Sequence, residues 1–252
     1  MVGNEKEEEL SFFKKPIQFS KSSLKKIFFR HFSKRFAFDL SVLTMPLIWN
    51  INYLKEKKII IPEKKFVKKI FEDISNRLTE LDIYCEELIA KSDAKCNVYL
   101  LSNLFNSGFC TLENEVDLYE EIILESAKPG ERVILKNHPR CSDMVLIQLK
   151  EKLNPFFEVE IITDKQFSFI PIELWTILLN SCKIFPIFST SAISLQYLYS
   201  KQVVMTLDSQ KIKKYLFFNK RKETIQGVEM CYEAIHVLED WDSKTPLWIK
   251  KN

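Results

Sequence analysis

The sequence predicts an α/β protein in which a parallel sheet carries helices on both faces and follows a mainly helical amino-terminal segment. After residue 96, short apolar runs alternate with stretches of helical period, a rhythm typical of β-α units in a parallel sheet. Residues 1–92 lack this alternation and carry apolar residues at helical spacing instead. We therefore expect two parts: a helical, basic and aromatic adaptor segment over residues 1–92, and an α/β domain over residues 93–252.

The amino-terminal part is expected to form two helices. The first begins near Ser22, where two serines precede apolar residues at helical spacing. Residues 59–61 form a short extended run, and Pro62 then opens a second helix that keeps its period to about Ala90. The segment 14–36 is rich in Lys, Arg and Phe. It is either a packed helix with solvated lysines or a helix that lies on an anionic membrane surface.

The expected elements of the α/β domain alternate along the chain. Strands are expected at residues 98–101, 133–135, 157–162, 183–188 and 203–207. Helices are expected at residues 113–126, 144–153, 172–179 and 191–199. Such a sheet is Rossmann-like, and its ligands bind outside the carboxyl ends of the strands, where the next helix offers free N–H groups.

Composition and charge exclude several classes of function. The net charge of +3 is too small to indicate a nucleic-acid partner. The four glycines are not spaced as a P-loop or a G-x-G-x-x-G motif requires. The six cysteines form no C-x-x-C pair, which indicates reduced thiols of a cytoplasmic protein and predicts no metal site. No apolar run reaches the length of about 18 residues that a membrane span needs.

His138 is the first candidate for chemistry, because it follows the strand expected at 133–135. Its imidazole can transfer a proton or, when protonated, bind a phosphate. Lys136 and Arg140 flank it and favour an anionic ligand, and Pro139 stiffens the turn. The alternative is a histidine that only caps a turn.

Hydroxyl groups follow another expected strand, at 183–188. Ser189, Thr190 and Ser191 stand at a helix start, where they either bind an anion or serve as ordinary N-caps. Glu173 stands in the first turn of another expected helix. A carboxylate at that place is favoured by the helix dipole, and it can also bind the two hydroxyls of a ribose.

These motifs carry a family resemblance over about residues 97–207. The chain contains, in this order, Lys136-Asn-His-Pro-Arg140, Pro171-Ile-Glu-Leu174 and Phe188-Ser-Thr-Ser191. Their order and approximate spacing resemble those of bacterial sialyltransferases and polysialyltransferases, which are GT-B enzymes of capsule and lipooligosaccharide synthesis. Ser102-Asn103 and residues 111–119 also resemble the segment before the His-Pro motif in that group.

The resemblance implies roles for individual residues. It implies that His138 binds the phosphate of CMP and assists its departure, that Ser189 and Thr190 hold the same phosphate, and that Glu173 contacts the cytidine ribose. It also implies a GT-B carboxy-terminal type of domain with CMP-sialic acid as donor substrate and no cofactor. Further nucleotide contacts are expected from Lys136, Pro139, Arg140 and Ser191.

The sequence departs from the family pattern at two places. The family carries an acidic pair before a glycine, and the second carboxylate deprotonates the acceptor hydroxyl. The corresponding loop here is Asn106-Ser107-Gly108, in which neither residue is a useful base. Glu113 is the substitute that we consider. The family also has an amino-terminal acceptor domain, for which residues 1–92 contain no recognisable counterpart.

We therefore expect a sialyltransferase-like glycosyltransferase that extends a capsule or lipooligosaccharide glycan by metal-independent, inverting transfer. The alternative is a non-catalytic or truncated relative that binds nucleotide or glycan without transfer. The expected partners are the nucleotide sugar, a glycan acceptor, and either a second copy of the chain or another chain that supplies the acceptor domain. The expected location is the cytoplasm, with peripheral contact at the inner membrane as an alternative. The basic cluster at 211–222 is either a solvated face or a guide for an anionic glycan.

Overall fold

The computed structural model describes residues 62–91, 94–162, 165–201 and 203–239, and four short strands outside the main domain. These strands are β1 (Leu40–Val42), β2 (Leu47–Ile48), β3 (Lys58–Ile60) and β8 (Leu247–Trp248). β1 pairs with β3, and β2 pairs with β8, both in parallel. The extended run expected at 59–61 corresponds to β3. The helix expected from Ser22 lies outside the described residues.

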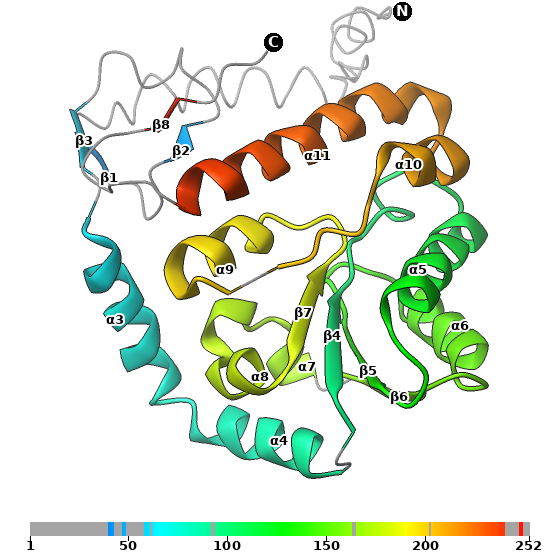
Figure 1. Ribbon diagram of the computed structural model, residues 1–252, viewed down its shortest axis with the longest axis horizontal. Coiled ribbons are helices and arrows are strands. Elements are labelled where there is room, and N and C mark those ends of the chain that lie inside the picture. Colours follow the sequence, from blue (N-terminus) through cyan, green and yellow to red (C-terminus); the bar gives the residue numbers. More distant parts are fainter. Residues whose placement is uncertain are drawn as a thin grey trace, which may run out of the picture.

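Four parallel strands form the central sheet (Figure 1). They are β4 (Cys96–Leu100), β5 (Arg132–Lys136), β6 (Glu158–Ile161) and β7 (Lys183–Pro186), in the spatial order β6-β5-β4-β7. Val98 of β4 lies between Ile134 of β5 and Ile184 of β7. The strand order reverses at β4, since β5 and β6 extend the sheet on one side and β7 on the other. The predicted Rossmann-like α/β fold is confirmed.

Helices surround this sheet. They are α3 (Lys64–Ser75), α4 (Thr79–Ala90), α5 (Leu112–Ser126), α6 (Asp143–Leu153), α7 (Lys165–Ser168), the 3₁₀ helix η1 (Ile172–Leu174), α8 (Thr176–Ser181), α9 (Ser191–Tyr199), α10 (Ser209–Tyr215) and α11 (Phe218–Glu239). The expected helices 113–126, 144–153 and 191–199 match α5, α6 and α9 to within one residue at each end. Side-chain caps fix two of these starts: Asn114 N donates to Thr111 Oγ1, and Met144 N donates to Ser142 Oγ.

Apolar side chains alternate between the two faces of the sheet, as the strand pleat requires. On one face, Tyr99 and Leu101 pack with the buried side of α5 and α6. On the other face, Val98 and Leu100 pack with α4 and α8. Tyr99 also stacks on Phe185 of β7, with ring centroids 4.8 Å apart. Both faces of the sheet are therefore covered, in agreement with the expected layering (Figure 1).

Residues 62–90 form two helices, so the single helix expected there is wrong. α3 ends at Ser75, whose hydroxyl donates to the carbonyl oxygen of Leu174 at 2.9 Å. Leu78 then leaves the helical conformation, with φ −97° and ψ 54°. The break lets the two helices pack on different surfaces, because α3 contacts α9 and η1 whereas α4 contacts α8. Both helices pack on the α/β domain; the domain boundary near residue 92 stays a prediction.

The helix expected at 172–179 is replaced by two shorter elements, η1 and α8, and the short helix α7 before them was not expected. Pro171 starts η1, and Trp175 interrupts the helix between η1 and α8 with φ −91° and ψ 56°. The Trp175 ring is fully buried, and its indole N–H donates to the carbonyl oxygen of Ile170 at 3.1 Å. The burial of this large side chain therefore coincides with a bend at Trp175, where the sequence pattern predicts one continuous helix over residues 172–179.

The carboxy-terminal part differs most from expectation. The strand expected at 203–207 is reduced to one bridge, between Val203 and Ile184 of β7. α10 and α11 lie where the sequence predicts only a basic cluster, at residues 211–222. Two lysines of that cluster are engaged within the fold: Lys211 pairs with Glu125 at 2.7 Å, and Lys214 pairs with Glu121. These pairs tie α10 to α5.

The thiols agree with the expectation of reduced, mostly buried cysteines. All six cysteines are free, and all except the half-buried Cys141 are buried. In the part of the chain that the structure describes, no helix combines the length and the apolar composition needed to cross a membrane.

Candidate functional site

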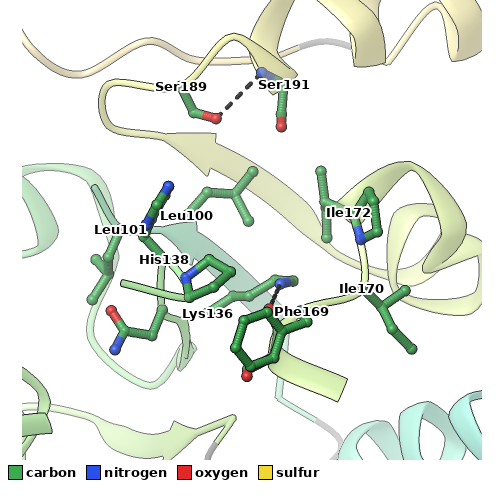
Figure 2. A pocket seen from close by; sticks show the side chains of 13 residues that line it. Leu100, Leu101, Lys136, His138, Phe169, Ile170, Ile172, Ser189 and Ser191 are labelled. Atoms are coloured by element: carbon green, nitrogen blue, oxygen red, sulfur yellow. Dashed lines mark hydrogen bonds between the residues drawn. The ribbon is translucent and has the colours of Figure 1, made fainter. Parts of the chain in front are cut away.

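A hollow of about 130 Å³ lies at the carboxyl edge of the sheet. We call it the first hollow. Figure 2 shows Lys136 and His138 on one side of it and Ser189 and Ser191 on the other. Its walls come from the ends of β4, β5 and β7 and from the segment between α7 and η1. The lining residues are Leu100, Leu101, Lys136, Asn137, His138, Pro139, Ser168, Phe169, Ile170, Pro171, Ile172, Ser189 and Ser191.

His138 lies in the turn that follows β5. The backbone N–H of Arg140 donates to its Nδ1 at 3.2 Å, so the neutral ring carries its proton on Nε2. Partial burial lowers the pKa of His138, and the positive charges of Arg140 and Lys136 lower it further. The imidazole is therefore neutral near pH 7 and can donate a hydrogen bond through Nε2. Arg140 acts on this ring through its backbone and its charge, and it does not line the hollow.

Lys136 is the last residue of β5 and only 7% of it is exposed. Its ammonium donates to the carbonyl oxygen of Ser168 at 3.1 Å and lies 5.1 Å from the centroid of the Trp175 ring. Burial lowers the pKa of Lys136 to about 8, although the Glu173 carboxylate opposes this shift. The hollow thus holds a buried, poorly hydrated cation, and an anion bound beside it would stabilise its charged form strongly.

The hydroxyl residues after β7 divide between two environments. Ser189 and Ser191 line the hollow, and Ser191 N donates to Ser189 Oγ at 3.2 Å. Thr190 is exposed, makes no cap hydrogen bond and does not line the hollow. Ser189 and Ser191, together with the first turn of α9, therefore face the side chains from β5.

Glu173 does not converge with His138 and Ser189 on the first hollow. Pro171 and Ile172 line it, but Glu173 is not among its lining residues. The Glu173 carboxylate instead accepts a hydrogen bond from Ser194 of α9, and its backbone oxygen accepts one from the hydroxyl of Tyr199 at 2.7 Å. These contacts give Glu173 a structural role that joins η1 to α9; the ribose contact stays a prediction.

A buried polar network supports the loop after β4. The Glu115 carboxylate accepts from the backbone N–H groups of Leu104 and Phe105, at 2.9 and 2.8 Å, and from the hydroxyl of Tyr119 at 2.6 Å. The Tyr119 hydroxyl accepts from Ser102 N at 3.0 Å, and Ser102 Oγ donates to the carbonyl oxygen of Phe188 at 2.8 Å. The network therefore joins the ends of β4 and β7 directly beside Ser189.

The loop expected to hold a base is fixed beside the His138 turn. Asn106 Nδ2 donates to the carbonyl oxygen of Arg140 at 2.9 Å, so its side chain ties the two loops together. Ser107 and Gly108 are exposed, and Gly108 has φ +72°, a conformation that favours glycine. Glu113 is exposed in the first turn of α5, and neither hollow described in this section includes it among its lining residues.

A second hollow of about 540 Å³ adjoins the first, between the ends of β5 and β6 and α6. The two hollows share Asn137, His138, Pro139, Ser168 and Phe169. The second hollow adds mainly apolar side chains, together with Asp143 and Cys141. Burial raises the pKa of the Cys141 thiol to about 12, so this thiol stays protonated near pH 7.

Several residues of this site were not predicted from the sequence. Ser168 and Phe169 belong to the segment around α7, which the sequence did not indicate as an element. Asn137 stands directly beside His138 after an expected strand, and this position could have indicated it as a site residue. Glu115 and Tyr119 are four residues apart on one helix, and this spacing is compatible with their hydrogen bond. Within the described residues, no cluster of three or more His, Cys, Asp or Glu side chains is placed to hold a metal ion.

The fold and the cleft define a class of protein: a Rossmann-like α/β domain with cationic and hydroxyl groups gathered at the carboxyl edge of its sheet. The family model described as alpha-2,8-polysialyltransferase (POLYST) matches residues 11–208, which is most of the chain. The chain belongs to this family, which is a family of sialyltransferases. The resemblance identified from the motifs over about residues 97–207 is thereby confirmed, and the match extends it toward the amino terminus to residue 11. No individual curated protein matches the sequence.

We expect Glu115→Gln to destabilise the fold by about 1–3 kcal/mol, because the amide places a donor against a backbone N–H and leaves a buried group unpaired. The free energy of unfolding in urea, followed by circular dichroism, measures this loss. The matched change Glu113→Gln, two residues away and exposed, should cost less than about 0.5 kcal/mol. Equal effects of the two substitutions would contradict the support role of Glu115.

Proposed function

We propose that the chain is a sialyltransferase-like glycosyltransferase that takes CMP-sialic acid as donor and transfers the sialyl group to a glycan at the cell surface. Capsule polysaccharide and lipooligosaccharide are the proposed classes of acceptor. The family supports the sialyl transfer. The observation that carries the nucleotide assignment is the first hollow, where Lys136 and His138 face Ser189 and Ser191 across a space of about 130 Å³.

The chemistry of the leaving group fits these side chains. In a direct, inverting displacement the acceptor oxygen forms a bond to the anomeric carbon while the bond from that carbon to the phosphate oxygen breaks. The electron pair leaves with CMP, so negative charge grows on the phosphate. Lys136 supplies a buried cation, His138 a donor at Nε2, and Ser189 and Ser191 hydroxyl groups. Donors and cations placed where charge develops are the main electrostatic means of lowering such a barrier. No step of this scheme requires a metal ion.

The loop at residues 106–108 offers no carboxylate to accept the proton of the acceptor hydroxyl. The resemblance implies that Asn106 and Ser107 stand where the family carries carboxylates, and Asn106 donates a hydrogen bond to the Arg140 carbonyl oxygen. This observation favours a second candidate function: a relative that binds nucleotide or glycan without transfer. An additional chain or a second copy that supplies an acceptor domain would fit both functions. Cytoplasmic location with peripheral contact at the inner membrane is part of the same proposal.

The nucleotide assignment predicts that CMP binds the chain and that His138→Ala weakens this binding by about 1.5–3 kcal/mol, or roughly 10- to 150-fold, the worth of a hydrogen bond to a charged phosphate. Titration calorimetry measures the affinity. His236→Ala is the control, because His236 is exposed on α11 and should leave CMP binding unchanged. Absence of CMP binding by the unmodified chain at millimolar concentration would refute the proposed function.

The lowered pKa of Lys136 predicts that the binding of CMP depends on pH. The ammonium attracts the phosphate and is lost as the pH rises through its pKa of about 8. CMP affinity should therefore fall by up to about tenfold between pH 7 and pH 9, where the phosphate is already a dianion and does not titrate. Calorimetric titrations at pH 7, 8 and 9 test this trend, and Lys136→Met should abolish it. An affinity that stays constant across this range in the unmodified chain would show that Lys136 does not contact the phosphate.

The base loop predicts slow turnover. With CMP-sialic acid and a glycan that ends in sialic acid, the unmodified chain should release CMP roughly 10²- to 10⁴-fold more slowly than a chain with a general base. Ser107→Asp should raise the rate of release, because Ser107 is exposed beside the His138 turn. Fast release that survives Glu113→Gln would show that the base lies elsewhere. Undetectable release by both chains, with CMP still bound, would favour the non-catalytic function.

A further inference from the structure

The two hollows form one cleft with two lobes. They share His138, Asn137 and three further residues, so the side chain proposed to contact the phosphate lies at their junction. The first lobe accounts for a phosphate group, but its volume of about 130 Å³ is too small for the rest of a nucleotide. The second lobe, of about 540 Å³, has the size of a small-molecule site.

The lining of the second lobe favours a flat, uncharged ring. Its walls include Leu146, Ile147, Ile161, Ile162 and Phe169, and Asp143 is the one carboxylate among its described lining residues. None of its described lining residues is a lysine or an arginine. A carboxylate-bearing sugar would meet the like charge of Asp143 there, whereas a pyrimidine offers apolar faces to the walls and N–H groups to an acceptor.

Asn137 supplies an acceptor without a partner. Only 8% of the residue is exposed, and it lines both lobes. Its Oδ1 is buried, and no described residue donates a hydrogen bond to it. A buried oxygen left unpaired costs about 1–3 kcal/mol, so a ligand that brings a donor to it recovers this cost on binding. Asn137 precedes His138 directly, and the two side chains can therefore contact different parts of one nucleotide.

We propose that the second lobe binds the pyrimidine ring of the nucleotide and that Asn137 is a specificity residue, whose amide oxygen accepts a hydrogen bond from the exocyclic amino group of cytosine. Uracil carries a carbonyl oxygen at this position, which places two acceptors opposite each other. The lobe thus selects a cytidine nucleotide over a uridine nucleotide. This inference rests on the proposed function, since it takes the phosphate to lie against His138.

The test compares CMP with UMP, which differ only in the base, by titration calorimetry of the full chain. We expect the unmodified chain to bind CMP about tenfold or more tightly than UMP. Asn137→Leu, which keeps the side-chain size and removes the acceptor, should weaken CMP binding about tenfold and change UMP binding less than about twofold. Asn137→Asp keeps an acceptor oxygen and should retain the preference for CMP even if both affinities fall.

Controls separate this inference from a loss of folding and from a failure of the proposed function. Asn154→Leu makes the same exchange at an exposed residue that lines neither hollow, and it should leave both affinities unchanged. Thermal unfolding of each variant shows whether the fold is intact. Should Asn137→Leu fail to fold, Asn137→Ala removes the same acceptor with a smaller side chain and should show the same selective loss of CMP affinity.

Four outcomes would overturn the inference. Equal affinities of the unmodified chain for CMP and UMP, or an equal loss of both in Asn137→Leu, would remove Asn137 from base recognition while CMP binding keeps the proposed function. A loss in Asn137→Leu that affects CMP-sialic acid but not CMP would show that the lobe holds the sugar. Binding of neither nucleotide by the unmodified chain would refute the proposed function together with this inference.

Discussion

The position of β4 between two parallel neighbours is the constraint on which the rest of the domain depends. Because all four strands run in the same direction, their carboxyl ends meet at one edge. The strand order reverses at β4, so β5 and β7 are its two neighbours and the chain segments that follow β4 and β7 lie side by side at that edge. The residues after β5 complete the rim from the other side. Side chains more than fifty residues apart, such as His138 and Ser189, are brought to one cleft by this order alone.

Such an edge leaves many backbone groups that need partners, and the domain supplies them with a few buried side chains. Glu115 pairs two backbone N–H groups of the loop after β4, and Ser102 joins that loop to the end of β7. Asn106 joins it to the His138 turn. The rim of the cleft is therefore fixed by polar contacts to its loops, in addition to the packing of the sheet beneath. Rigid support of this kind is what a site needs to keep its groups placed before a ligand arrives.

The sheet and its main helices could be predicted from the sequence, because apolar runs and hydroxyl caps are local signals. α5, α6 and α9 are examples, with Thr111 and Ser142 marking two of the starts. The break at Leu78 and the bend at Trp175 depend on what each side chain packs against. The spacing of apolar residues along the sequence does not contain this information. The location of His138, Ser189 and Ser191 at the carboxyl edge could be predicted from the alternation of strands and helices. The hydrogen bond between Glu173 and Ser194 could not be predicted, because it depends on how η1 packs against α9.

The contacts of Lys136 affect the energetics of anion binding in the cleft. Its ammonium contacts a carbonyl oxygen and an aromatic ring, and burial lowers its pKa although the Glu173 carboxylate opposes this shift. The contacts therefore replace the lost hydration of this cation only in part. An anion that binds beside it offsets this cost and stabilises the native state through linkage. Above pH 8, binding of an anion is coupled to the uptake of a proton by Lys136. Because the buffer supplies this proton, the heat of binding then varies with the ionisation enthalpy of the buffer.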